Sequence, residues 1–140
     1  MFTSNAMTII LNQLCGKTTS AMASSAYLAL SQTAPTAEGG GVTEPVGNGY
    51  QRALLGESSG TKHMGTPEYD ATAGKTTISN TSEIHFNEAT GSWGTLTHFA
   101  IYGSKSGGTP LYVGQLNTSL TPVENNVVII KVGDLKISIE

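Results

Sequence analysis

The chain has 140 residues, of which only 12% are charged, and a formal net charge of −3. Its seven Lys and Arg residues are scattered, which argues against nucleic-acid binding because phosphate contacts need clustered basic side chains. The longest apolar runs, residues 9–11 and 127–130, are far shorter than the roughly 18 residues of a membrane span. We therefore expect neither a nucleic-acid partner nor a membrane, and no signal peptide.

The N-terminal residues 1–6 resemble the remnant of a cleaved expression tag, because Ser-Asn-Ala is followed by a second methionine. We therefore take Met7 as the native start and exclude residues 1–6 from the fold. The single cysteine, Cys15, rules out an internal disulfide and fits production in a reducing cytoplasm. We expect Cys15 to be a small apolar residue on a short helix.

That helix is predicted over residues 8–18. Ile10 and Leu14 lie four residues apart and form an apolar stripe, and Gly16 marks the expected end. A helix of roughly ten residues is marginal alone, so we expect it to dock on the sheet. The alternative is an assembly helix that packs on a partner subunit.

Apolar runs between turn formers predict a series of strands. Residues 26–31 form the first clear strand, and residues 50–55 and 76–86 are expected to form two more. The intervening residues 56–75 are polar and rich in turn formers. They predict a long loop or weak hairpin that is suited to a partner-specific surface.

Residues 92–103 hold the only tryptophan and predict a central strand covered on both faces. Residues 111–116 should return antiparallel after a hairpin loop, and Gly114 indicates a bulge or a close backbone approach. Strict alternation in the central strand places Leu96, His98, Ala100 and Tyr102 on one face and Thr95, Thr97, Phe99 and Ile101 on the other.

The last two predicted strands, residues 127–132 and 135–139, are expected to pair with each other across Gly133-Asp134. In the second of them apolar and polar residues alternate strictly, which indicates a strand with one solvent-exposed face. Taken together, the elements predict a mostly β, single-domain fold over residues 7–140. We expect an antiparallel β-sandwich or jelly-roll-like domain with a short N-terminal helix.

Five residues are predicted to build the core or a subunit interface: Trp93, His98, Phe99, Tyr102 and Tyr112. We interpret Trp93 as a lid on the core, with a sugar-stacking platform as the alternative. His98 lies in the most apolar strand, so we expect a buried imidazole that ties strands together through a hydroxyl or carbonyl. An interface role for His98 is the other interpretation.

The loop residues His63, Glu68, Tyr69 and Asp70 form a candidate partner-binding surface. The three histidines are far apart and have no metal-ligand spacing, and the paired acidic residues lie on surfaces expected to be wet. No nucleophile with a base and no phosphate-binding loop is evident. We therefore assign no catalytic, cofactor-binding or metal-binding residue, and we expect a protein that is not an enzyme.

Taken in order, several segments resemble one family of small proteins of tailed bacteriophages and prophages, usually labelled tail fibre proteins or uncharacterised virion proteins. The segments are residues 27–36 (YLALSQTAPT), 49–52 (GYQR), 92–102 (SWGTLTHFAIY), 111–116 (LYVGQL) and 133–139 (GDLKISI). The resemblance extends over nearly all of the chain from Met7, except for residues 56–75.

This resemblance implies a structural virion component, made in the bacterial host cytoplasm and acting by binding through β-surfaces. The expected partners are the chain itself, as a homo-oligomer with a trimer favoured, other virion proteins, and a host-surface glycan. A tail or fibre location is the first hypothesis, and a capsid head-decoration protein is the second. A carbohydrate-binding module is the third; it predicts an exposed cluster of Tyr50, Tyr69 and Trp93. An enzyme, which would need converging carboxylates, is the fourth.

Overall fold

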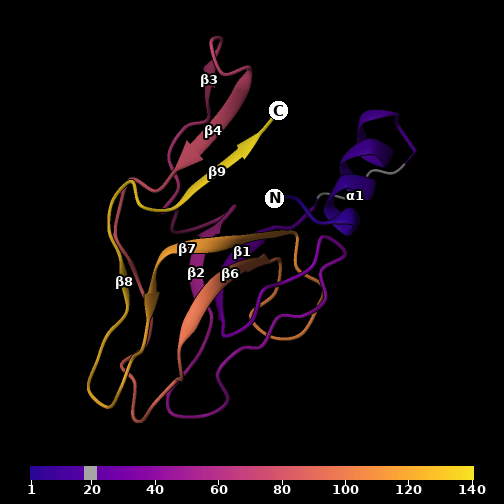
Figure 1. The fold of residues 1–140 in the computed structure, drawn as a ribbon. Helices are drawn as coiled ribbons and strands as arrows, with labels where there is room; N and C mark the ends of the chain where they lie inside the picture. The colour runs from indigo at the N-terminus through magenta and orange to yellow at the C-terminus, as the bar shows by residue number, and fades with distance from the viewer. Residues whose placement is uncertain (18–21) are drawn as a thin grey trace.

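The computed structural model describes residues 1–17 and 22–140 and shows a mostly β fold (Figure 1). Every pair of described strands is antiparallel, so the prediction of an antiparallel β fold with a short N-terminal helix is confirmed. The described residues contain no helix that could span a lipid bilayer. In chain order the elements are α1 (Ser4–Leu14), β1 (Ser25–Ser31), β2 (Ala53–Glu57), β3 (Glu68–Asp70), β4 (Lys75–Ser79), β5 (Ile84–His85), β6 (Leu96–Tyr102), β7 (Tyr112–Leu120), β8 (Ile129–Ile130) and β9 (Lys136–Ile139).

The largest sheet has the strand order β2-β1-β6-β7, and β6 is an inner strand of it, as the sequence predicts. Two smaller sheets, β3-β4-β9 and β5-β8, supply residues to the same core. Leu30 of β1 and Phe99 of β6 belong to one apolar cluster with Ile84 of β5 and Leu135 just before β9. The smaller sheets therefore cover one face of the large sheet.

The opposite face of the large sheet is also covered. Ala29, Ala100, Tyr102 and Val113 form a second apolar cluster there, and Val42 from the long connection between β1 and β2 packs on it. The prediction of a central strand covered on both sides is thus confirmed for β6.

One detail of the predicted face pattern in β6 is wrong. Leu96 belongs to the cluster of Phe99 and Ile101, not to the face of Ala100 and Tyr102. The pairing register with β7 shifts between Leu96 and His98, and such a bulge moves the residues before it to the other face.

Gly114 makes the close backbone approach expected of it. A Cβ atom built at Gly114 would lie 2.6 Å from the ring of Phe99, its partner on β6. The glycine therefore gives the Phe99 ring room to lie over β7.

The strand pairing at the C-terminal end differs from the prediction. The two segments expected to pair with each other pair elsewhere: β8 with β5, and β9 with β4. The predicted strand over residues 76–86 is correspondingly split between β4 and β5, which lie in different sheets. The segment predicted to be a long loop or weak hairpin contains β3, which forms a hairpin with β4, in agreement with the second alternative.

The N-terminal helix also begins earlier than predicted, at Ser4, and the predicted end at Thr18 lies outside the described residues. Thr3 is the N-cap: its side-chain oxygen accepts a hydrogen bond from the Ala6 amide. Gly16, with a φ of 69°, follows the C-cap residue Cys15, which is exposed and not an apolar part of the helix.

Residues 1–6 are part of the fold, so excluding them was wrong. The N-terminal amine donates to the Val113 carbonyl at 2.8 Å, and Thr3 is fully buried. The aromatic ring of Phe2 packs edge-on against Tyr112 at a centroid distance of 5.1 Å. The segment before α1 thereby covers the outer edge of β7; its origin in a tag stays a prediction.

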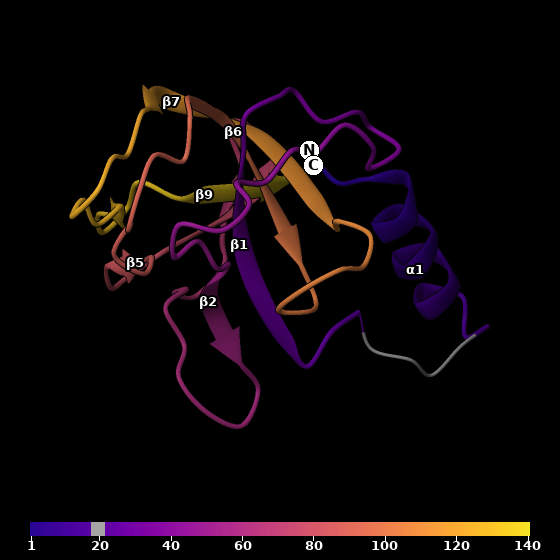
Figure 2. The ribbon, with the colours of Figure 1, turned by 90° about the horizontal axis from the view of Figure 1, so that it is seen from below.

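The expected docking of the helix on the sheet is wrong as well. Ala6 is the one helix residue that is fully buried, and α1 stands out beside the β layers in both ribbon views (Figures 1 and 2).

Candidate interaction surfaces

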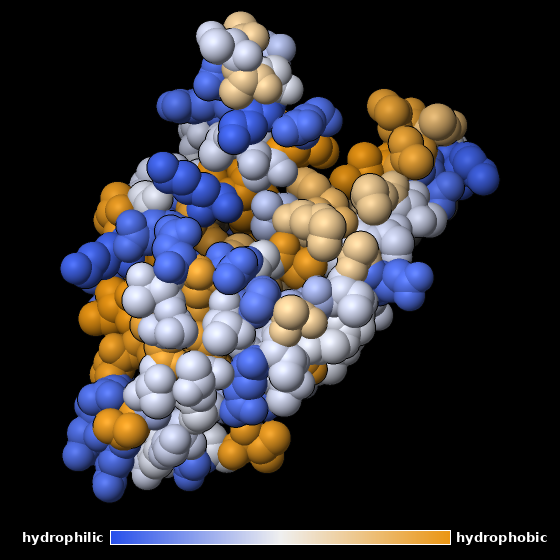
Figure 3. Space-filling view, in the orientation of Figure 1, coloured by the Kyte–Doolittle hydropathy of each residue, from blue (hydrophilic) through white to orange (hydrophobic). Residues whose placement is uncertain are grey.

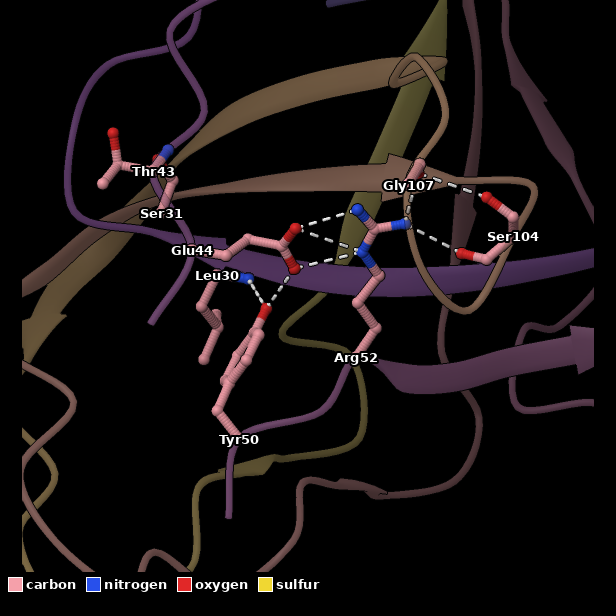
Figure 4. A network of polar contacts seen from close by, with 8 residues as sticks. All are labelled: Leu30, Ser31, Thr43, Glu44, Tyr50, Arg52, Ser104 and Gly107. Carbon is pink, nitrogen blue, oxygen red and sulfur yellow. Dashed lines mark hydrogen bonds and ion pairs between the residues drawn. The ribbon is translucent and has the colours of Figure 1, made fainter. Parts of the chain in front are cut away.

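A partly buried ion pair between Arg52 and Glu44 holds three segments together at one end of the large sheet (Figure 4). Arg52, just before β2, donates from Nε to Glu44 Oε1 at 3.0 Å and from Nη2 to Glu44 Oε2 at 2.8 Å. Its Nη1 donates to the carbonyls of Ser104 and Gly107, both at 2.9 Å. The guanidinium lies 3.5 Å from the ring centre of Tyr102. We call these residues, together with Tyr50, the clamp.

Tyr50 completes the clamp from below. Its hydroxyl donates to Glu44 Oε1 at 2.7 Å and accepts from the Leu30 amide at 3.1 Å. Burial and the hydrogen bond to Glu44 raise the pKa of Tyr50 well above its ordinary range, and burial raises the pKa of Tyr102. Burial opposes the charge of Arg52, but the hydrogen bonds to Glu44 outweigh it, so the pKa of Arg52 is raised. Both phenols thus stay neutral beside one ion pair.

The clamp is a structural element. All three guanidinium nitrogens of Arg52 already have protein acceptors, and its side chain is 5% exposed. The arrangement fixes the connection around Glu44 and the β6–β7 loop against the sheet. Our sequence analysis missed it, although oppositely charged residues eight positions apart in a charge-poor chain are a signal that could have found it.

Trp93 lies under the clamp and is buried, with 1% of its surface exposed. Its indole N–H donates to the Asn48 carbonyl at 2.8 Å, and its ring meets Tyr50 edge-on at 5.3 Å and Phe86 at 6.4 Å. The interpretation of Trp93 as a core residue agrees with this position. Because its ring has no free face, the aromatic platform of Trp93, Tyr50 and Tyr69 on which the carbohydrate-binding hypothesis rested does not form.

The other predicted core residues occupy different environments. Phe99 and Tyr102 are buried, and Tyr112 is partly buried and stacks on Phe99 with ring centres 6.2 Å apart. His98 is only partly buried, and its Nδ1 lies 2.8 Å from the hydroxyl of the adjacent Thr97. The expected hydroxyl partner of His98 is therefore its neighbour Thr97, whose Oγ1 also lies 3.4 Å from the Gln32 carbonyl beyond the end of β1. The role of His98 in joining strands or in an interface stays a prediction.

The residues of the predicted partner-binding loop are not gathered at one point. His63 Nδ1 lies 2.7 Å from the Ser82 hydroxyl, whereas Glu68, Tyr69 and Asp70 form the outer strand β3. All three β3 residues are exposed, and Tyr69 is 70% exposed. Asp70 accepts hydrogen bonds from the next turn, through the amides of residues 72 and 73. In residues 1–17 and 22–140, no three His, Cys, Asp or Glu residues form a group that could hold a metal ion.

A second surface is strongly apolar and lies around α1. The helix exposes Met7, Leu11 and Leu14, which follow one another along one stripe. Beside the helix is a groove of about 460 Å³. Apolar surface continues from the helix into the hollow next to it (Figure 3). Residues that line the groove include Phe2, Ala26, Leu55, Ile78, Tyr112 and Ile137.

The fold and these surfaces define a small antiparallel β domain with a projecting helix, and its continuous exposed apolar surface is typical of a subunit in an assembly. A protein-family model described as "Podophage GP4 fiber I protein gp80" matches residues 2–138. The chain therefore belongs to this family of podophage fibre proteins and is a component of the virion, which confirms the resemblance found in the sequence. No curated protein matches the chain.

Proposed function

We propose that this chain is a structural fibre subunit of the virion that forms a homo-oligomer, with a trimer favoured, and acts by binding and not by catalysis. The observation that carries the proposal is the uncovered stripe of α1, where exposure rises from 47% at Met7 to 61% at Leu11 and 77% at Leu14. Large apolar side chains in such a row favour burial against another chain. Membership of a fibre family supports the same function.

The test of self-association is the molar mass of the purified protein, measured by light scattering coupled to size-exclusion chromatography over a range of concentrations. We expect a mass that is a small multiple of 14.5 kDa, and three times that value for a trimer. A mass of one chain at all concentrations would contradict the homo-oligomer.

The position in the virion is a separate part of the proposal. We place the chain in the tail, or in the tail fibres, of a phage or prophage particle. Electron microscopy of intact particles labelled with gold-conjugated antibodies against the chain tests this position. Label at the tail agrees with the proposal. Label over the head would contradict it and would favour the capsid-decoration hypothesis.

We further propose that the β3–β4 hairpin contacts the partner of the assembled fibre, such as a glycan of the host surface. Its support is the exposure of Glu68, Tyr69 and Asp70 on a strand at the edge of its sheet. The variant Tyr69→Ala should weaken binding of fluorescent protein to host cells, while the exposed control Lys105→Ala should not. Equal binding by a variant without the hairpin would contradict this contact.

A further inference from the structure

The base of α1 is fixed to the β domain by several contacts. Met1 exchanges two backbone hydrogen bonds with Val113 on the edge of β7, with distances of 2.8 and 2.9 Å. The Thr3 amide donates to the Leu111 carbonyl at 3.0 Å, the Thr3 hydroxyl donates to the Pro110 carbonyl at 2.7 Å, and Ala6 is fully buried. The direction in which the helix leaves the domain is therefore set by its first turn.

Because the base is fixed, α1 cannot swing into the groove of its own chain without breaking these contacts. Exposure instead increases along the stripe of Met7, Leu11 and Leu14, as the helix moves away from the domain. The stripe and the groove are two apolar surfaces of one chain that do not cover each other.

The charges of the two surfaces agree with direct contact. Residues 4–14 carry no ionisable side chain, and α1 has neither an acidic first turn nor a basic last turn. Of the residues that line the groove, Glu57 and Lys62 are the acidic and basic ones, and the Lys62 ammonium donates to the Ser58 and Gly60 carbonyls at 3.3 and 3.4 Å. The helix therefore brings no charge of its own that would lose its hydration on entering this groove.

We infer that α1 of one copy docks its Met7–Leu11–Leu14 stripe into the apolar groove of a second copy. This inference rests on the proposed homo-oligomer and names the surfaces that build it. Placing an amphipathic helix in an apolar groove is a common mode of recognition. If each chain gives its helix to the next, the contact is head-to-tail. A rotation between copies that closes then gives a ring, such as the proposed trimer, in which every helix and every groove is covered.

A lipid surface is a poorer occupant for the helix. Helices that lie on membranes usually carry Lys or Arg on the polar face, and α1 has neither. A helix of eleven residues also gains little from its own hydrogen bonds, so it needs a packed partner along its length.

A mixed cross-linking experiment tests the contact directly, since Cys15 at the end of α1 is the only cysteine and is exposed. The natural chain is co-expressed with a size-tagged copy that carries Cys15→Ser and Lys62→Cys at the groove, and is treated with a short bismaleimide. The control copy carries Cys15→Ser and Glu124→Cys, an exposed position that does not line the groove.

We expect a cross-linked band of mixed size with the Lys62→Cys copy, at least tenfold stronger than with the Glu124→Cys copy. Equal or absent mixed bands from an oligomer that light scattering has shown to exist would overturn the docking inference and leave the homo-oligomer standing. A natural chain that is monomeric throughout would overturn both.

A second measurement uses charge on the helix. The double variant Leu11→Glu and Leu14→Glu should reduce the oligomer to single chains, whereas Gln13→Glu, a polar exposed position on the same helix, should leave the mass unchanged. Circular dichroism spectra check that both variants keep the β fold of the natural chain. A folded double variant with an unchanged mass would contradict the inference.

Discussion

The clamp end of the molecule and the α1 side differ in which side chains they expose to solvent. Around Arg52, Glu44 and Tyr50, polar groups are withdrawn from water, and among the described residues no buried side-chain N or O atom lacks a hydrogen-bond partner. Around α1, Leu11 and Leu14 are left in water. The first region satisfies its polar groups within one chain, whereas the second leaves large apolar side chains exposed. The stability of the first region should therefore depend on residues of the single chain, from the buried aromatic centre to the clamp.

The largest effect is expected at Trp93. Trp93→Ala should lower the free energy of unfolding by about 3–5 kcal/mol, since it removes a buried ring and its hydrogen bond to Asn48. Phe99→Ala, at 8% exposure, should have a similar cost. Urea denaturation measures both, with the exposed Tyr69→Ala as the control, expected to change stability by less than about 0.5 kcal/mol. Unchanged unfolding of the core variants would refute the buried aromatic centre.

Breaking the clamp should come next. Arg52→Met leaves the Glu44 carboxylate, whose side chain is 23% exposed, without its partner, so we expect a loss of about 3 kcal/mol. The double variant with Glu44→Gln should recover part of the loss, because no unpaired charge remains. The matched control is Glu83→Gln in the exposed Glu83–His85 pair, expected to cost less than about 0.5 kcal/mol. Equal losses of stability for Arg52→Met and Glu83→Gln would show that the clamp stabilises the fold no more than an exposed ion pair does.

The packing of Gly114 against Phe99 predicts a smaller loss. Gly114→Ala should cost about 1–3 kcal/mol, since its Cβ would lie 2.6 Å from the Phe99 ring in a packed core. Gly56→Ala is the matched strand control, because the nearest atom to its Cβ would be 3.6 Å away. If thermal melting ranks the two variants in the opposite order, the close approach is not a stabilising constraint.

The smallest effect concerns alkaline pH. An unfolded tyrosine loses its proton near pH 10, whereas burial keeps Tyr50 protonated in the folded chain, because its pKa is raised. Above about pH 10 the unfolded state therefore binds fewer protons, and the free energy of unfolding should fall by up to about 1.4 kcal/mol per pH unit for this residue. Below that pH the contribution is complete.

Urea denaturation at a series of pH values from 8 to 12 measures this slope. Tyr50→Phe should reduce it, although the lost hydrogen bonds to Glu44 and Leu30 lower stability at neutral pH by about 1–2 kcal/mol. Tyr69→Phe, at an exposed position, should leave the slope as it is. A slope unchanged by Tyr50→Phe would assign the alkaline loss to other groups.

Local sequence patterns determined the fold class, β1, the central position of β6, the β6–β7 hairpin, and the roles of Trp93 and Gly114. Each of these features depends on the alternation of apolar and polar residues, or on turn-forming residues, within a segment of about ten residues. The order of motifs also indicated the phage fibre family.

Tertiary structure alone decided which distant segments meet. β8 and β9 pair with β5 and β4 instead of with each other, and the bulge after Leu96 changed the face of that residue. The Arg52–Glu44 pair and the exposed stripe of α1 likewise depend on how the whole chain packs, since the same residues read alone fit a wet loop or a docked helix. At these positions burial is decided by the assembled layers, because the local pattern is compatible with more than one environment.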